Sequence, residues 1–294
     1  MQQKSKSHVI QFFIIVAALL LVPALVISWM TAGSLVAAHP ESVGKPPADL
    51  PADSITLNSE SGSCLAGWHI PSEQKRGVIV LAHPYQGSRL NMLNRARLLH
   101  SQGYAVVMTD LQAHGESPGK NVTIGYLERH DITAAVHFAK KRHPGEPIGI
   151  LGFSMGGAAT LLATPLNVDA MVLESVYSSI ESAVRNRVIV KLGALAALPT
   201  KILLMQLKPR MGISVANLQP IDWLPKIGCP VFIMSGAEDR HTTEEETHAM
   251  FEAANEPKEF WMVEGAAHED LYDFSPDDYR TRLLSFFERH LQPV

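Results

Sequence analysis

The stretch GFSMGG at residues 152–157 places a single serine among glycines, between two different kinds of segment. The residues before the turn, 147–153 (PIGILGF), form an apolar run of strand length. The residues after it, 158–163 (AATLLA), are good helix formers. Ser154 therefore lies on a tight turn from strand to helix, where glycines let the two elements approach closely. This pattern is typical of a nucleophile elbow, which exposes a reactive hydroxyl above a sheet.

A serine hydroxyl is a weak nucleophile, so the chemistry needs a histidine base and an acid that orients the histidine. Asp239 follows the apolar segment PVFIMSGAE, and His268 follows the segment EFWMVEGAA. The order serine, acid, histidine along the chain is the one expected with this elbow. We therefore predict Ser154 as the nucleophile, His268 as the base and Asp239 as the acid. Glu174, at the end of another predicted strand, is the alternative acid.

With these three motifs the chain resembles serine hydrolases of the α/β-hydrolase superfamily, in the branch of bacterial esterase- and peptidase-like proteins of unassigned substrate. The resemblance covers residues 55–291 and implies a mostly parallel central sheet, helices on both faces and a helical lid. The alternation of strand-like and helix-like segments along the chain predicts the same layers. The insertion at about 175–225 takes the place of the lid, and we expect two short apolar helices that meet near Pro199. Two roles are open for them: an apolar lid that binds an acyl group, or helices that only pack against the core.

The stretch GVIVLAHPYQGS at residues 77–88 resembles the strand and loop that supply the oxyanion hole in this family. His83 is followed by Pro84 where the family commonly has glycine, and proline has no N–H to donate. We therefore assign the oxyanion-hole donors to the backbone N–H groups of Tyr85 and Met155. Losing one such donor typically costs about 3 kcal/mol of transition-state stabilisation.

The resemblance implies an acyl-enzyme cycle on a small-molecule acyl substrate, with carboxylic esters as the expected class and thioesters or amides as variants. Two alternatives stay open: a membrane-tethered protein that binds a ligand without turnover and, among enzymes, a serine peptidase. The chain contains no phosphate loop, dinucleotide fingerprint or H-E-x-x-H site, so we expect no cofactor and no metal. A net charge of −4 without a basic cluster argues against nucleic acid. The sequence leaves open the oligomeric state and whether Cys64 and Cys229 pair.

The first forty residues differ from the rest of the chain. After a polar start with Lys4 and Lys6, residues 9–30 form a mostly apolar run. A helix of this length, at about 1.5 Å per residue, crosses a hydrocarbon core of roughly 30 Å. We therefore predict an N-terminal transmembrane helix within residues 1–38, with a cleaved signal segment as the alternative.

The positive charges near this run predict its orientation. The two lysines precede it and none follows until Lys45, which places the N-terminus in the cytoplasm and the hydrolase domain outside. The predicted location is the cell membrane, as a single-pass protein, or the secreted or periplasmic space after signal cleavage. Residues 39–53 are interpreted as a proline-rich linker and residues 54–294 as the α/β-hydrolase domain.

Overall fold

The computed structural model describes residues 2–292, and within the first helix it describes the side chains of residues 15, 19 and 21 onward. The main sheet has the strand order β10-β9-β8-β7-β4-β5-β3-β2. Its strands are β2 (Asp53–Asn58), β3 (Cys64–Ile70), β4 (Val78–Ala82), β5 (Ala105–Thr109), β7 (Ile148–Phe153), β8 (Ala170–Glu174), β9 (Val231–Gly236) and β10 (Lys258–Val263). Strand β3 runs antiparallel to β2 and β5, and the other neighbours are parallel. The predicted α/β-hydrolase fold with a mostly parallel sheet is therefore confirmed.

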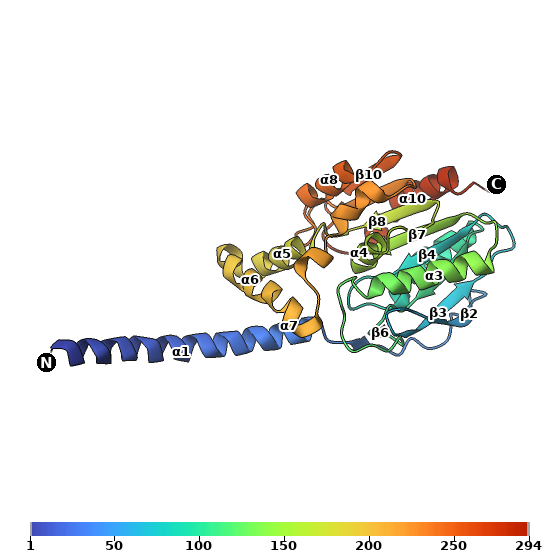
Figure 1. Cartoon of the computed structure of the whole chain (residues 1–294). Coiled ribbons are helices and arrows are strands. Elements are labelled where there is room, and N and C mark those ends of the chain that lie inside the picture. Colours follow the sequence, from blue (N-terminus) through green and yellow to red (C-terminus); the bar gives the residue numbers. More distant parts are fainter. Residues whose placement is uncertain (1, 293–294) are drawn as a thin grey trace.

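Helices cover both faces of the sheet (Figure 1). One layer contains α3 (Glu128–Arg142), α4 (Met155–Leu162) and α8 (Glu244–Ala253), and the other contains α2 (Leu93–Ser101) and α10 (Pro276–His290). Successive side chains of a strand point to opposite faces of its sheet. In β4, Val78 and Val80 accordingly join the first layer, whereas Ile79 and Leu81 join the second.

The lid consists of α5 (Ile180–Leu192), α6 (Ala197–Met205) and α7 (Leu207–Met211), connected by short 3₁₀ turns and loops to the sheet. Helix α5 ends at Gly193, whose φ of 54° lies in the left-handed region that glycine tolerates. Pro199 lies in the first turn of α6, where a proline costs no helical hydrogen bond. The two apolar helices of the lid therefore meet before Pro199 rather than at it.

Helix α1 (Gln2–Leu35) extends from the body, and its C-terminal end lies against the lid (Figure 1). The Arg210 guanidinium stacks over the Trp29 ring at 4.0 Å, and Gln206 Nε2 donates to Ser28 Oγ at 2.8 Å. The next residues form β1 (His39–Pro40), which pairs with β6 (His114–Gly115). The chain after α1 thus runs along the hydrolase domain.

In the part of the chain that the structure describes, no helix is both long enough and apolar enough to cross a membrane. This finding contradicts the predicted transmembrane helix, the single-pass location at the cell membrane and the membrane as a partner. Much of the run at 9–30 lies outside the residues whose side chains are described.

Candidate functional site

Ser154 lies at the turn between β7 and α4, in a backbone conformation that is rare for a residue with a side chain. Its φ is 50° and its ψ is −113°, and its N–H donates to the Glu174 carbonyl at 2.8 Å. A Cβ atom added at Gly152 would lie 2.4 Å from the Gly157 Cα, and one at Gly156 would lie 2.3 Å from the Ala82 carbonyl oxygen. Only glycines allow strand and helix to pack this closely.

In the structure, the side chains of Ser154, His268 and Asp239 contact one another in sequence. Ser154 Oγ lies 3.3 Å from His268 Nε2, and His268 Nδ1 lies 2.6 Å from Asp239 Oδ2. Because an ionised carboxylate only accepts hydrogen bonds, His268 carries its proton on Nδ1, and Nε2 is left to accept the serine proton. The second oxygen of Asp239 accepts the backbone N–H groups of His241 and Thr242, at 2.7 and 2.9 Å.

Glu174, the alternative acid, is occupied elsewhere. It is fully buried, its Oε1 accepts from Arg95 Nη2 at 2.6 Å, and its Oε2 accepts from the Tyr279 hydroxyl at 2.7 Å. Burial raises the pKa of Glu174, and the Arg95 guanidinium opposes this effect. Arg95 also binds both oxygens of Asp270, at 2.8 Å each. The four residues form an ion-pair cluster beside the loop that carries the proposed base.

Sequence reasoning did not find Arg95. A signal for it was nevertheless present, because a helix in an α/β layer buries one face and Arg95 is three and four residues from Leu98 and Leu99, on the same face of the helix. A buried arginine requires carboxylates. Their identity depends on packing between segments far apart in the chain, which the sequence pattern does not give.

The two predicted oxyanion donors line the same cavity as Ser154. Met155 is the first residue of α4, so its N–H has no partner within the helix. Tyr85 lies in a turn closed by the Gly87 N–H, which donates to the Pro84 carbonyl at 3.1 Å. The Tyr85 hydroxyl donates to the Leu35 carbonyl at 2.6 Å, which connects this turn to the end of α1.

His83 fixes the start of this turn. Its Nδ1 donates to the Pro84 carbonyl at 2.8 Å, so the ring proton lies on Nδ1 and Nε2 accepts the Leu111 N–H at 2.9 Å. Protonation of Nε2 would break the second bond, and burial lowers the pKa of His83 to about 3. A neutral imidazole therefore joins the ends of β4 and β5.

Ser154 forms part of the wall of an apolar cavity of about 120 Å³ under the lid. The end of α1, the Tyr85 turn and lid helices α5 and α6 enclose it. Its lining consists of Ala32, Leu35, Val36, Tyr85, Ile124, Ser154, Met155, Tyr177, Ile180, Ala183, Val184, Arg187, Leu203, Leu204 and Leu207. The described lining is almost entirely apolar, and Arg187 is its charged residue. This is the composition of a pocket for an acyl group with a polar specificity contact.

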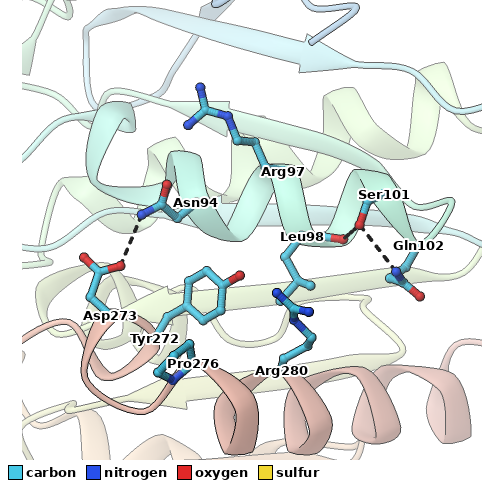
Figure 2. A pocket seen from close by; sticks show the side chains of 9 residues that line it. All are labelled: Asn94, Arg97, Leu98, Ser101, Gln102, Tyr272, Asp273, Pro276 and Arg280. Carbon is cyan, nitrogen blue, oxygen red and sulfur yellow. Dashed lines mark hydrogen bonds between the residues drawn. The ribbon is translucent and has the colours of Figure 1, made fainter. Parts of the chain in front are cut away.

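A larger and more open hollow, of about 720 Å³, lies between α2 and the start of α10 (Figure 2). Its lining includes Arg97, Arg280 and Asp273, and Asp273 accepts from Asn94 at 3.2 Å. None of Ser154, Asp239 and His268 lines it. Size alone therefore favours this hollow, whereas the chemistry favours the smaller cavity, which we take as the candidate site.

A histidine next to the candidate site adds a metal-binding capacity to it. Ligand atoms of Asp239, His241 and His268 all lie within 4.8 Å of one another. The rings of His241 and His268 meet edge to face, with centroids 5.3 Å apart. Burial is the main reason why the pKa of His241 is lowered, so this imidazole is a neutral ligand near pH 7. The same imidazole of His268 contacts Ser154 through its Nε2 atom.

Comparisons with known proteins show what this chain is similar to. The family model described as serine aminopeptidase, S33, matches residues 73–221. The uncharacterized protein YqkD of Bacillus subtilis is 25% identical over 245 residues, which cover 80% of this chain and 78% of YqkD. A monoacylglycerol lipase of Mycolicibacterium smegmatis is 36% identical over 89 residues, 30% of this chain and 32% of the lipase. The Pyrococcus furiosus esterase Pf2001 superposes with a TM-score of 0.73 at 23% identity, covering 87% of this chain and 98% of the esterase.

Proposed function

The chain belongs to the serine aminopeptidase, S33, family of α/β-hydrolases, and from this premise we propose that it is a serine hydrolase that cleaves carboxylic esters of small molecules. The coarser part of this statement, a hydrolase, follows from the family. The finer part rests on one observation: the line of contacts from Ser154 through His268 to Asp239 ends in an apolar cavity. A nucleophile next to its base, with the base held by a third group, is the arrangement that acyl transfer needs.

In the proposed cycle, His268 Nε2 takes the proton of Ser154 while Oγ attacks the ester carbonyl. The N–H groups of Tyr85 and Met155 hold the developing oxyanion. Protonated His268, stabilised by Asp239, then gives its proton to the leaving alcohol, and an acyl-serine forms. Water repeats the two steps on the acyl-serine and releases a carboxylic acid.

The composition of the cavity favours an ester over the amino-terminal peptide bond that the family description names. An aminopeptidase has to bind a substrate ammonium group, which requires a carboxylate or similar acceptor near the nucleophile. Among the described lining residues there is no Asp or Glu, and the charged residue present is cationic. A substrate ammonium group would therefore meet apolar walls and a like charge.

A fluorophosphonate probe and p-nitrophenyl esters of graded chain length test the proposal on the full chain. We expect labelling of the native protein, loss of labelling and hydrolysis in Ser154→Ala, and faster turnover of short esters than long ones. The cavity of about 120 Å³ is smaller than an engineered cavity of about 150 Å³ that accepts benzene. Ser175→Ala is the matched control. Like Ser154, Ser175 is a serine directly after a strand and has a positive φ, but it does not line the cavity.

Two results would contradict the proposal. A folded native protein that neither reacts with the probe nor hydrolyses any of these esters would favour a binding protein without turnover. Release of an N-terminal amino acid from peptide p-nitroanilides, at rates above those for esters, would favour the peptidase.

A further inference from the structure

We infer that Arg187 makes the Ser154 cavity a binding site for a carboxylate, so that the preferred substrates are esters that carry a second, ionised acid group. The inference rests on the proposed function and narrows its substrate class. Arg187 lies on lid helix α5. Ile180, Ala183, Val184 and Arg187 follow one another at helical spacing on α5, and all four line the cavity. The guanidinium therefore lies on the helix face that covers the proposed nucleophile.

Arg187 is half-buried, and it differs in its partners from Arg89 and Arg95, which are buried. Arg89 is paired with Asp110 and Glu116, and Arg95 with Glu174 and Asp270. Within residues 2–292, Arg187 forms no salt bridge; its Nη1 donates to the Ala183 carbonyl of its own helix at 2.9 Å. One bond of this kind leaves most of its five N–H donors available.

The surroundings make this lack of a counterion costly. Burial is the largest cause of the lowered pKa of Arg187. The opposing electrostatic influence comes from Tyr177, Asp239, Tyr85 and Glu246. An arginine nevertheless stays protonated in proteins, so the charge persists in an apolar cavity. A ligand carboxylate that entered the cavity would meet the fork-shaped guanidinium and form a charge-assisted bidentate pair.

Neighbouring hydroxyls do not compete for this role. The Tyr85 hydroxyl donates to the Leu35 carbonyl at 2.6 Å, and the Tyr177 hydroxyl donates to the Ile124 carbonyl at 2.9 Å. Both protons are therefore committed to backbone carbonyls, and both oxygens present lone pairs, which repel an anion. Arg187 is thus the side chain in the described lining that is equipped to donate to a carboxylate.

Two pairs of esters test the inference on the full chain. The first pair, monomethyl succinate and methyl butyrate, places the charge on the acyl side. The second, 4-acetoxybenzoate and its neutral methyl ester, places it on the alcohol side. We expect the native protein to have the higher kcat/KM for the anionic member of one pair, by about tenfold to a hundredfold, as for a hydrogen bond to a charged group. In Arg187→Gln the ratio of kcat/KM for the anionic member to kcat/KM for the neutral member should fall to about one.

The controls separate charge from structure. Arg185→Gln changes an exposed arginine of the same helix and should keep the preference. Arg187→Lys keeps the charge without the fork and should keep part of the preference. High salt should reduce the preference in the native protein less than it would for an exposed ion pair, because Arg187 is half-buried.

The inference is overturned if the native protein prefers the neutral member of both pairs, or if Arg187→Gln lowers both members of a pair equally. Such results, together with retained Ser154 labelling, would leave the hydrolase proposal standing. A binding measurement makes the test independent of turnover. In Ser154→Ala, monomethyl succinate or 4-acetoxybenzoate should raise the thermal unfolding midpoint, and the added change Arg187→Gln should abolish this rise.

Discussion

The Nδ1 atom of His268 lies 2.6 Å from the Oδ2 atom of Asp239, although the two residues belong to loops after different strands. Asp239 is only 4% exposed, and two backbone N–H groups hold its other oxygen. The carboxylate is therefore fixed in the position that sets the tautomer of the imidazole. Glu174, the other carboxyl considered for this role, faces Arg95 instead.

The two carboxyl groups should respond differently to neutralisation. Asp239→Asn should lower kcat by roughly 10³- to 10⁴-fold with little change in stability, because the imidazole loses its orienting acceptor. Glu174→Gln should keep most turnover per folded molecule but destabilise the fold by about 3 kcal/mol or more, because Arg95 loses a buried partner. Ester kinetics and denaturant unfolding of both variants provide the measurement. A larger loss of kcat in Glu174→Gln would reverse the assignment of the acid.

Buried histidines should make the fold sensitive to acid. Burial lowers the pKa of His83 to about 3 and that of His69 to about 4, below the ordinary value of 6.5. An unfolded chain therefore binds more protons than the folded one between these values. The contribution of these two histidines to the free energy of unfolding is therefore complete above pH 6.5. It decreases as the pH falls toward 4, by up to about 1.4 kcal/mol per pH unit for each histidine.

Unfolding free energies at pH 7 and pH 5 check this prediction. We expect His83→Asn to be less stable than the native protein at pH 7 but to lose less stability on going to pH 5. Asp131, whose pKa burial raises to about 6, acts in the opposite direction but contributes equally to both proteins. His137→Gln, at an exposed position, is the control. Equal losses in native protein and His83→Asn would mean that His83 is not held neutral.

The end of α1 forms part of the wall of the cavity, which predicts an effect of a change far from the proposed triad in sequence. Ala32 is 8% exposed and lines the cavity, so Ala32→Phe should fill it and lower kcat/KM for short esters by about tenfold or more. Leu25→Phe, at a position of the same helix that is 54% exposed, should have no effect. Unchanged kinetics in a folded Ala32→Phe variant would show that α1 is dispensable for the site.

Strand ends explain how much of the candidate site the sequence could predict. In a parallel sheet the carboxyl ends of strands meet at one edge, so residues after β7, β9 and β10 are expected to converge once the strands are recognised. The elbow is local, because its glycines and Ser154 are consecutive. The convergence of Ser154, Asp239 and His268 at one edge of the sheet was therefore predictable from the strand pattern.

Other features depend on packing that the pattern does not encode. An apolar run such as 9–30 has no preferred partner in its sequence, and the structure places its last turns against Arg210 and Gln206 of the lid. The rotation of α5, which turns Arg187 toward the cavity, is likewise set by contacts between elements distant in the chain. Apolar periodicity predicts that a helix buries one face, but not which polar atom that face presents.

The position of His241 beside the proposed triad predicts inhibition by zinc. Two imidazoles and a carboxylate with ligand atoms within 4.8 Å of one another match a set that Zn²⁺ accepts. Zinc bound to His268 would occupy the imidazole that takes the serine proton, so added zinc chloride should inhibit ester hydrolysis and a chelator should restore it. Mg²⁺, which prefers oxygen ligands in octahedral geometry, should have no effect.

His241→Gln separates this site from general zinc binding. The change removes one ligand but keeps the backbone N–H that Asp239 accepts, so basal turnover should change little. The zinc concentration for half inhibition should rise about tenfold or more, whereas His248→Gln, at an exposed position, should leave it unchanged. Equal zinc sensitivity in native protein and His241→Gln would place the inhibitory metal elsewhere, because a three-ligand site cannot lose an imidazole without losing affinity.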